Sequence, residues 1–183
     1  LPDRPLLVKT RTPFQLPPGA ATTFYVSIPI WVSVSVTNVN ECHELCQIPS
    51  IMLSNSWFGD FFEGELCYAL KSQARREIEE MGKEPHFAIC PFMVENKAED
   101  TFPIQKICIR PQFLSIYAGD FRMWTNEVSV TFRGEGLPSK LQYSSSPPGL
   151  LGNPVQLQPA KEIPEDNFFS NTFSNFTFNS LHR

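Results

Sequence analysis

Apolar and polar residues alternate most regularly between residues 24 and 36. The apolar positions are Phe24, Val26, Ile28, Ile30, Val32, Val34 and Val36, and the residues between them are mostly polar or aromatic. A period of two with many β-branched residues is typical of a half-buried strand. Pro29 cannot donate a ladder hydrogen bond, so we expect an edge position or a bulge there.

Shorter segments of the same kind follow along the chain. The pattern predicts strands at 88–94, 104–109, 113–117, 121–124, 128–132 and 140–143. Turn residues separate them, among them Asn96 to Asp100 and the Ala118-Gly119-Asp120 loop of a hairpin. Short strands at this spacing predict a mainly β fold, an antiparallel β-sandwich of the jelly-roll or immunoglobulin-like kind.

One segment departs from the strand pattern. Between residues 64 and 81 the apolar residues are spaced as on a helix, and Gly82 and Pro85 supply a stop. We predict a strand over 65–71 and a helix over 73–81. At most one short helix is therefore expected.

The chain changes character near residue 150. Residues 1–150 are expected to form the single sandwich domain, and 151–183 a C-terminal extension rich in Pro, Asn and Phe. Five Phe lie between 168 and 178 and alternate with Ser, Asn and Thr. Such a tail is expected to dock on its own domain or on a partner, for example within a homodimer, because strand addition is a common recognition mode.

The distribution of charged and apolar residues argues against a nucleic-acid partner and against a membrane span. The net charge is −4, and the densest basic run, Arg75-Arg76, is followed by three acids within four residues. Nucleic-acid binding needs clustered Lys and Arg, so no nucleic-acid partner is expected. Residues 12–40 carry no charge, but their prolines and their alternation argue against a membrane span.

The five cysteines are Cys42, Cys46, Cys67, Cys90 and Cys108. An odd count leaves at least one thiol unpaired, and three of them lie in apolar segments. Reduced thiols and a cytoplasmic location are expected. The sequence shows no signal-peptide pattern, but it begins without Met, so a removed leader stays an open alternative.

Two groups of residues could support catalysis. Cys42, His43 and Cys46 have donor types that bind zinc, but the second pair of a zinc site is missing. Cys67 or Cys90 could act as a nucleophile with His86 as its base, but nothing in the sequence places them together. No nucleotide-binding or hydrolase motif occurs. We therefore expect no cofactor, and an enzyme is the least favoured interpretation.

Aromatic residues give the most suggestive signal. Residues 54–62 place Trp57 and Phe58 in a polar, Gly-containing segment with Asp60, and a second segment holds Trp124, Asn126 and Glu127. Trp often lies where one end of a site is apolar and the other is wet. These six residues are the candidate ligand site, and the alternative is that the large rings only cap the core.

Several short stretches also resemble a known family. They are Leu-Pro-Pro-Gly at 16–19, Ile-Pro-Ile-Trp-Val at 28–32, Ser-Trp-Phe-Gly-Asp at 56–60, Gly-Glu-Leu-Cys-Tyr-Ala-Leu at 64–70 and Met-Trp-Thr-Asn-Glu-Val at 123–128. Together they resemble an uncharacterised prokaryotic family, domain-of-unknown-function family four-three-two, over about residues 1–150. The resemblance implies no activity and no catalytic residues.

Three functional hypotheses result. The favoured one is a non-catalytic protein-interaction or structural module. The alternative is a small-molecule or carbohydrate-binding protein that uses Trp57 and Trp124. The third is an enzyme that depends on a metal or on Cys.

Overall fold

The computed structural model describes residues 1–183 except 40, 60, 63, 135–138, 165–168 and 171–183. Within the described residues the regular structure is almost entirely β, which confirms the predicted class. The described part of the chain forms three sheets: one of four strands, one of eight and a separate two-stranded hairpin. No helix among these residues is long and apolar enough to cross a bilayer.

The four-stranded sheet has the order β5-β6-β1-β8. Its strands are β1 (Leu6–Leu16), β5 (Ser54–Phe58), β6 (Glu65–Ala69) and β8 (Phe102–Ile109). Strand β1 runs antiparallel to β8 but parallel to β6, and its pairing with β8 shifts between Lys9 and Phe14.

The eight-stranded sheet is built around β7 (Phe87–Asn96). One edge of β7 pairs with β2 (Ala21–Pro29) along its whole length, and the other pairs in turn with β10 (Met123–Thr125) and β11 (Val128–Phe132). The remaining strands are β9 (Ile116–Ala118), β12 (Ser139–Tyr143), β13 (Val155–Gln158) and β14 (Phe169–Ser170).

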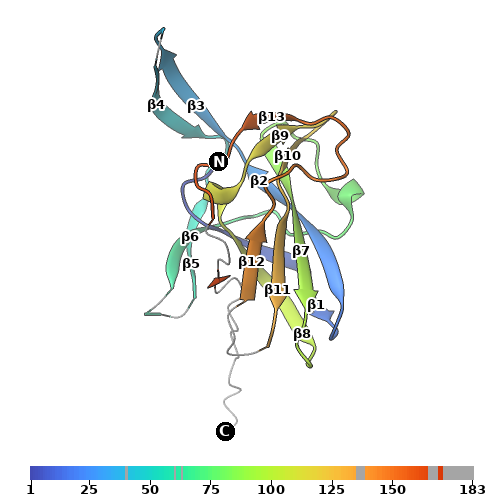
Figure 1. Cartoon of the computed structure of the whole chain (residues 1–183). Coiled ribbons are helices and arrows are strands. Elements are labelled where there is room, and N and C mark those ends of the chain that lie inside the picture. Colours follow the sequence, from blue (N-terminus) through green and yellow to red (C-terminus); the bar gives the residue numbers. More distant parts are fainter. Residues whose placement is uncertain (40, 60, 63, 135–138, 165–168, 171–183) are drawn as a thin grey trace.

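The sheets are mixed, and this corrects the prediction of a purely antiparallel sandwich. Strand β7 runs parallel to both β10 and β11, and β1 runs parallel to β6. Together the strands curl around a common core (Figure 1). Parallel pairs need long connections, so they cannot be recognised from local turn signals.

The core lies between the inner faces of the two large sheets. Alternate residues of each strand supply it, as the period of two predicts. Its largest fully buried side chains include Phe92 and Phe102, and Phe102 stacks on Phe132 with ring centroids 3.9 Å apart. Buried Asn96 closes the β7–β8 turn, because its amide donates to the Leu16 and Asp100 carbonyls.

The predicted helix over 73–81 is wrong. Among the residues that the structure describes, the helical elements are two short 3-10 turns, η1 (Ile78–Glu80) and η2 (Pro111–Phe113). Residues 74 and 75 instead form bridges to the strands beside them: Ala74 N–H donates to the Lys9 carbonyl, and Arg75 exchanges two backbone hydrogen bonds with Tyr25. The helix-like spacing arises because Ala74, Ile78 and Met81 all cover the body of the fold.

The long alternating stretch at 24–36 divides into two strands. β2 ends at Pro29, and β3 (Trp31–Thr37) begins a hairpin with β4 (Cys42–Pro49). Ile30 N–H donates to the His86 carbonyl, which fixes the point where the chain leaves the large sheet. The β3–β4 hairpin, called the arm below, projects beyond the body of the molecule (Figure 1).

Candidate functional site

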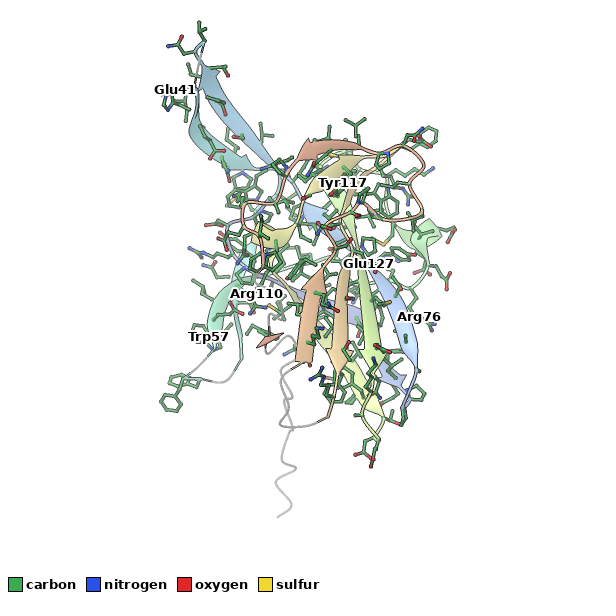
Figure 2. The ribbon with its side chains drawn as sticks, viewed as in Figure 1. Glu41, Trp57, Arg76, Arg110, Tyr117 and Glu127 are labelled. Atoms are coloured by element: carbon green, nitrogen blue, oxygen red, sulfur yellow. The ribbon has the colours of Figure 1, made fainter. Side chains whose placement is uncertain are left out.

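Five of the six residues of the predicted ligand site are described by the structure, and these five lie in two separate places. Trp57 and Phe58 lie on β5 in the four-stranded sheet, whereas Trp124, Asn126 and Glu127 lie on or after β10 in the eight-stranded sheet. Figure 2 shows Trp57 and Glu127 at separate places on the molecule. Asp60 lies outside the described residues. The sheet topology thus separates the Trp57 segment from the Trp124 segment, which the sequence pattern suggests as one site.

Trp124 and Asn126 are buried and make contacts that support the fold. Trp124 is 5% exposed and packs in a small cluster with Met81 and Ile89. Asn126 is buried, and its side chain accepts a hydrogen bond from Ser115 N–H at 2.8 Å while donating to the Ser144 carbonyl at 2.7 Å. A buried amide with these partners fixes the backbone and is not available to a ligand.

The β5 end of the site differs from the β10 end. Phe58 is buried, but Trp57 is 49% exposed and lies opposite half-exposed Leu66 on β6. Beyond the end of β5, Phe61 and Phe62 are 86% and 92% exposed, with their rings edge to face at 5.4 Å. Trp57, Phe61 and Phe62 therefore form an exposed aromatic surface near the end of β5, and Trp124 is not part of it.

The candidate metal ligands are also separated. The segment 42–46 is the first part of strand β4, and a bulge at Leu45 shifts the register between the two halves of the strand. Cys42 lies opposite Thr37 and Cys46 opposite Val34, so the two thiols face opposite sides of the arm. Among the described residues, no group of three or more His, Cys, Asp or Glu side chains is arranged to hold a metal ion.

The three other thiols are buried in the body. Burial raises the pKa of Cys67, and it raises the pKa of Cys90 and that of Cys108 to about 12. The thiolate is the nucleophilic form of Cys, so these groups are unreactive near neutral pH. They act as small apolar residues of the core.

One partly buried ion pair joins different strands. The Arg110 guanidinium contacts the Glu65 carboxylate, and Arg110 N–H donates to the Tyr143 hydroxyl at 3.3 Å. Burial raises the pKa of Tyr143 above its usual range. These contacts link β6, the end of β8 and β12, so we interpret the group as structural.

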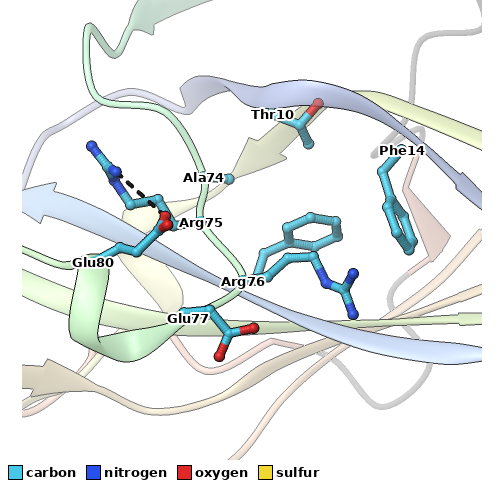
Figure 3. Close-up of a pocket in the computed structure, with 8 residues that line it drawn as sticks. Thr10, Phe14, Ala74, Arg75, Arg76, Glu77 and Glu80 are labelled. Atoms are coloured by element: carbon cyan, nitrogen blue, oxygen red, sulfur yellow. Dashed lines mark hydrogen bonds and ion pairs between the residues drawn. The ribbon is translucent and has the colours of Figure 1, made fainter.

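A groove of about 400 Å³ lies where the segment at 74–77 crosses from β1 to β2. Figure 3 shows the Arg76 guanidinium beside the Phe14 ring, at 4.8 Å from the ring centroid. Arg75 is paired with Glu80 at 3.4 Å. The cations of the groove thus already have partners, and an anionic ligand would have to displace them.

The arm is the most unusual surface. Register places Val32, Val34 and Val36 of β3 on the same face as Cys46 and Ile48 of β4, and His43 lies on that face too, opposite Val36. The four aliphatic side chains are 56%, 39%, 53% and 52% exposed in chain order, and Cys46 is exposed as well. We call these five residues the apolar face of the arm.

The opposite face of the arm is polar and tied to the body. Hydrogen bonds from Gln47 at 2.9 Å and from Ser33 at 2.6 Å lower the pKa of the Glu44 carboxyl. Lys161 donates to the Gln47 side chain at 3.4 Å, so the polar face is turned toward the segment that follows β13. The apolar face is therefore turned the other way.

Comparison with known proteins gives one result. No curated protein and no solved structure matches the chain significantly. A family model described as "Protein of unknown function (DUF432)" matches residues 1–178. The match covers nearly the whole chain and both large sheets, which confirms the resemblance found in the sequence motifs. The chain therefore belongs to the DUF432 family.

Proposed function

We propose that this protein is a non-catalytic protein-binding module and that the arm is its binding element. The observation that carries the proposal is the apolar face of the arm, five apolar residues exposed together on a projecting hairpin. Single exposed apolar residues are common on protein surfaces, but contiguous exposed patches mark interaction sites.

The energetics of a hairpin support this proposal. An isolated two-stranded hairpin is marginally stable in water, and it needs a further layer on its apolar face for independent stability. The polar face of the arm has hydrogen bonds within the hairpin and to Lys161, so the missing layer belongs on the other side. A partner that covers the apolar face would supply that layer.

The chemistry of the arm selects the kind of partner. Residues 31–49 include two acids, Glu41 and Glu44, and no Lys or Arg. A phosphate backbone or an anionic membrane surface would be repelled by the acids and would find no cation. An aliphatic protein surface is the complement that fits. The five free thiols support a reducing compartment such as the cytoplasm as the setting.

Two cysteines of the arm provide the test. Cys46 lies on the apolar face and Cys42 on the polar face of the same strand, and both are exposed in the single chain. In an extract of cells that make the protein at its natural level, a maleimide reagent should label Cys46 about tenfold more slowly than Cys42 if about ten dissociation constants of partner are present. Equal labelling of the two thiols in the extract would contradict the proposal.

The aromatic end of the β5–β6 hairpin supports a second candidate function. Trp57, Phe61 and Phe62 are exposed there, and such rings also serve as platforms for sugars and other small molecules. This function would use the β5 end alone, because Trp124 is buried elsewhere. Quenching of Trp fluorescence by oligosaccharides in the native protein, and its loss in Trp57→Ala, would support it.

A further inference from the structure

We propose that the groove between β1 and β2 is a binding site for a free α-amino acid with an apolar side chain. The apolar side chain lies on the floor of the groove, the carboxylate binds Arg76 and the ammonium group binds Glu77. The groove shares no residue with the arm, so this inference is independent of the proposed function.

The backbone around the groove is fixed by hydrogen bonds. Ala74 N–H donates to the Lys9 carbonyl at 2.9 Å on the β1 side, and Arg75 exchanges hydrogen bonds of 2.7 and 3.0 Å with Tyr25 on the β2 side. Beyond Arg75 the chain leaves β2 and enters η1. The groove is therefore formed before any ligand binds, as is usual for small-molecule sites.

The floor of the groove is apolar. Phe24 and Ala74 are each 2% exposed, and Phe14 is partly buried, with its ring edge to face with that of Phe24 at 5.9 Å. The hydroxyl of buried Thr10 already donates to the Ile104 carbonyl at 3.2 Å. The volume of about 400 Å³ lies within the roughly 300–1,000 Å³ of small-molecule pockets. The floor therefore complements an aliphatic or aromatic side chain.

The rim of the groove carries two cations and two anions. Arg75 and Glu80 are paired at 3.4 Å, and Figure 3 shows this pair at one end of the groove, with Arg76 and Phe14 at the other. Within the described residues, no ion pair engages the Arg76 guanidinium or the Glu77 carboxylate. One charge of each sign is therefore open to a ligand, and the two cations balance the two anions.

These charges select a zwitterion. A ligand with only a carboxylate would be repelled by Glu77, and a ligand with only an ammonium group would be repelled by Arg76, because both side chains line the same groove. An α-amino acid has both charges on adjacent groups, next to the carbon that carries its side chain. Its charges match the rim, and an apolar side chain matches the floor.

Binding of the carboxylate moves Arg76. In the free protein its guanidinium lies 4.8 Å from the centroid of the Phe14 ring. A cation–π contact at an exposed site contributes only about two- to fivefold to an equilibrium constant. A planar guanidinium binds a carboxylate through two parallel hydrogen bonds, the strongest geometry for an exposed ion pair. The carboxylate therefore draws Arg76 away from Phe14, and the uncovered ring becomes part of the floor.

The test is a titration of the purified full chain with L-phenylalanine up to about 20 mM, followed by proton–nitrogen NMR, because a ligand this small dissociates in the low millimolar range. Saturable shifts should appear at the backbone amides of residues 74–77 and of Thr10. Glycine has both charges but no apolar side chain, and it should bind at least about fivefold more weakly. N-acetyl-L-phenylalanine and L-phenylalaninamide each lack one charge, and each should also bind at least about fivefold more weakly.

Two variants assign the charges. Arg76→Gln should weaken binding of L-phenylalanine at least about fivefold. Glu77→Gln should do the same and should also remove the preference for L-phenylalanine over N-acetyl-L-phenylalanine, which a structural role of Glu77 would not change. Glu79→Gln and Lys83→Gln are the matched controls: each removes one charge from an exposed residue of the same segment outside the groove, and each should leave binding unchanged.

Three results would overturn the inference. The first is a native protein that shows no saturable shifts over this range, or shows them only away from the groove. The second is equal binding of L-phenylalanine and N-acetyl-L-phenylalanine to the native protein, because recognition of a carboxylate alone is not recognition of an amino acid. The third is native affinity in both Arg76→Gln and Glu77→Gln.

Discussion

Replacement of Asn126 separates a structural role from a ligand-binding role more cleanly than any other single change. Its side chain is 2% exposed and connects three segments of backbone. It accepts from Ser115 N–H and donates to the carbonyls of Ser144 and Phe113, the last at a long 3.4 Å. Asn126→Ala removes all three hydrogen bonds and leaves the backbone partners in place.

The expected cost follows from those partners. A buried polar group left without a partner costs about 1–3 kcal/mol, so the Ser115 N–H and the Ser144 carbonyl together predict a loss of about 3 kcal/mol. The long bond to Phe113 adds little. Because domains unfold with about 5–15 kcal/mol in total, the variant should fold but should be clearly weakened.

Asn126→Asp sharpens the prediction through its pH dependence. The new carboxyl group would face the two carbonyl oxygens that now accept from the amide, so its charged form is disfavoured and its pKa in the folded state rises. A group whose pKa is higher in the folded state loses its stabilising contribution as pH rises from the unfolded value, which is about 3.9 for Asp. The deficit of this variant relative to the native protein should therefore grow from pH 4 to pH 7.

Urea unfolding followed by Trp fluorescence measures these effects. A loss of about 3 kcal/mol with a slope near 2 kcal/mol/M lowers the midpoint by about 1.5 M. Asn55→Ala is the control, because exposed Asn55 has only a surface hydrogen bond from Arg4 at 3.2 Å, and its midpoint should barely move. If the urea midpoint of Asn126→Ala is as high as that of Asn55→Ala, the structural role of Asn126 is refuted.

Two further predictions concern pH and backbone conformation. The pKa values of Cys90 and Cys108 rise from 9.0 to about 12 on folding, so stability should fall between about pH 9 and 12 by up to about 1.4 kcal/mol per pH unit for each thiol. Urea unfolding across this range should show a shallower decline for Cys108→Ala and the native decline for Cys42→Ser; equal slopes in all three would contradict the assignment. At Gly19 the backbone φ is +73°, so Gly19→Ala should cost about 1–2 kcal/mol in thermal unfolding. Gly149→Ala, where an added Cβ also meets open space but φ is not left-handed, should cost less, and equal losses would count against backbone strain as the cause.

Local patterns in the sequence predicted the strands better than their partners. The turn at 96–100 and the hairpin around Gly119 form as expected, and the stretch at 24–36 is extended but divides into β2 and β3. Parallel pairing could not be predicted, because β7 meets β10 and β11 through connections that leave no local signal. The helix predicted over 73–81 is replaced by bridges from Ala74 and Arg75, since tertiary hydrogen bonding overrides the spacing of apolar residues.

The candidate site shows a different limit. The same alternation runs from Phe24 through Val36, yet Val26 is buried in the core and Val34 is exposed on the arm. Period-two patterning identifies a strand with one apolar face, but not what covers that face. The signal that could have located the arm is Pro29 followed by an uncharged alternating run, which marks the end of one sheet. A Trp beside polar residues suggests a ligand site in the sequence, but the sequence does not show that Trp124 and Asn126 are buried.

The C-terminal extension is described only in part. The predicted extension at 151–183 contributes β13, which pairs with β9 at the edge of the large sheet, and β14, which pairs with β12. The remaining Phe-rich positions, 171–183 and residues 165–168, lie outside the described residues. The prediction of docking or of a homodimer through that tail therefore stays a prediction.

The pairing of β1 with β8 has a consequence for synthesis of the protein on the ribosome. Leu6 lies opposite Ile109 and Ala21 opposite Glu95, so the first two strands have their partners far along the chain. At about 5–20 residues per second, several seconds pass between the emergence of β1 and that of β8. During that time the apolar side chains of β1 and β2 have no sheet to complete, whereas the local β3–β4 hairpin can form in microseconds. The nascent chain should therefore depend on chaperones until β8 has left the ribosome, and truncation before residue 109 should yield an aggregating product.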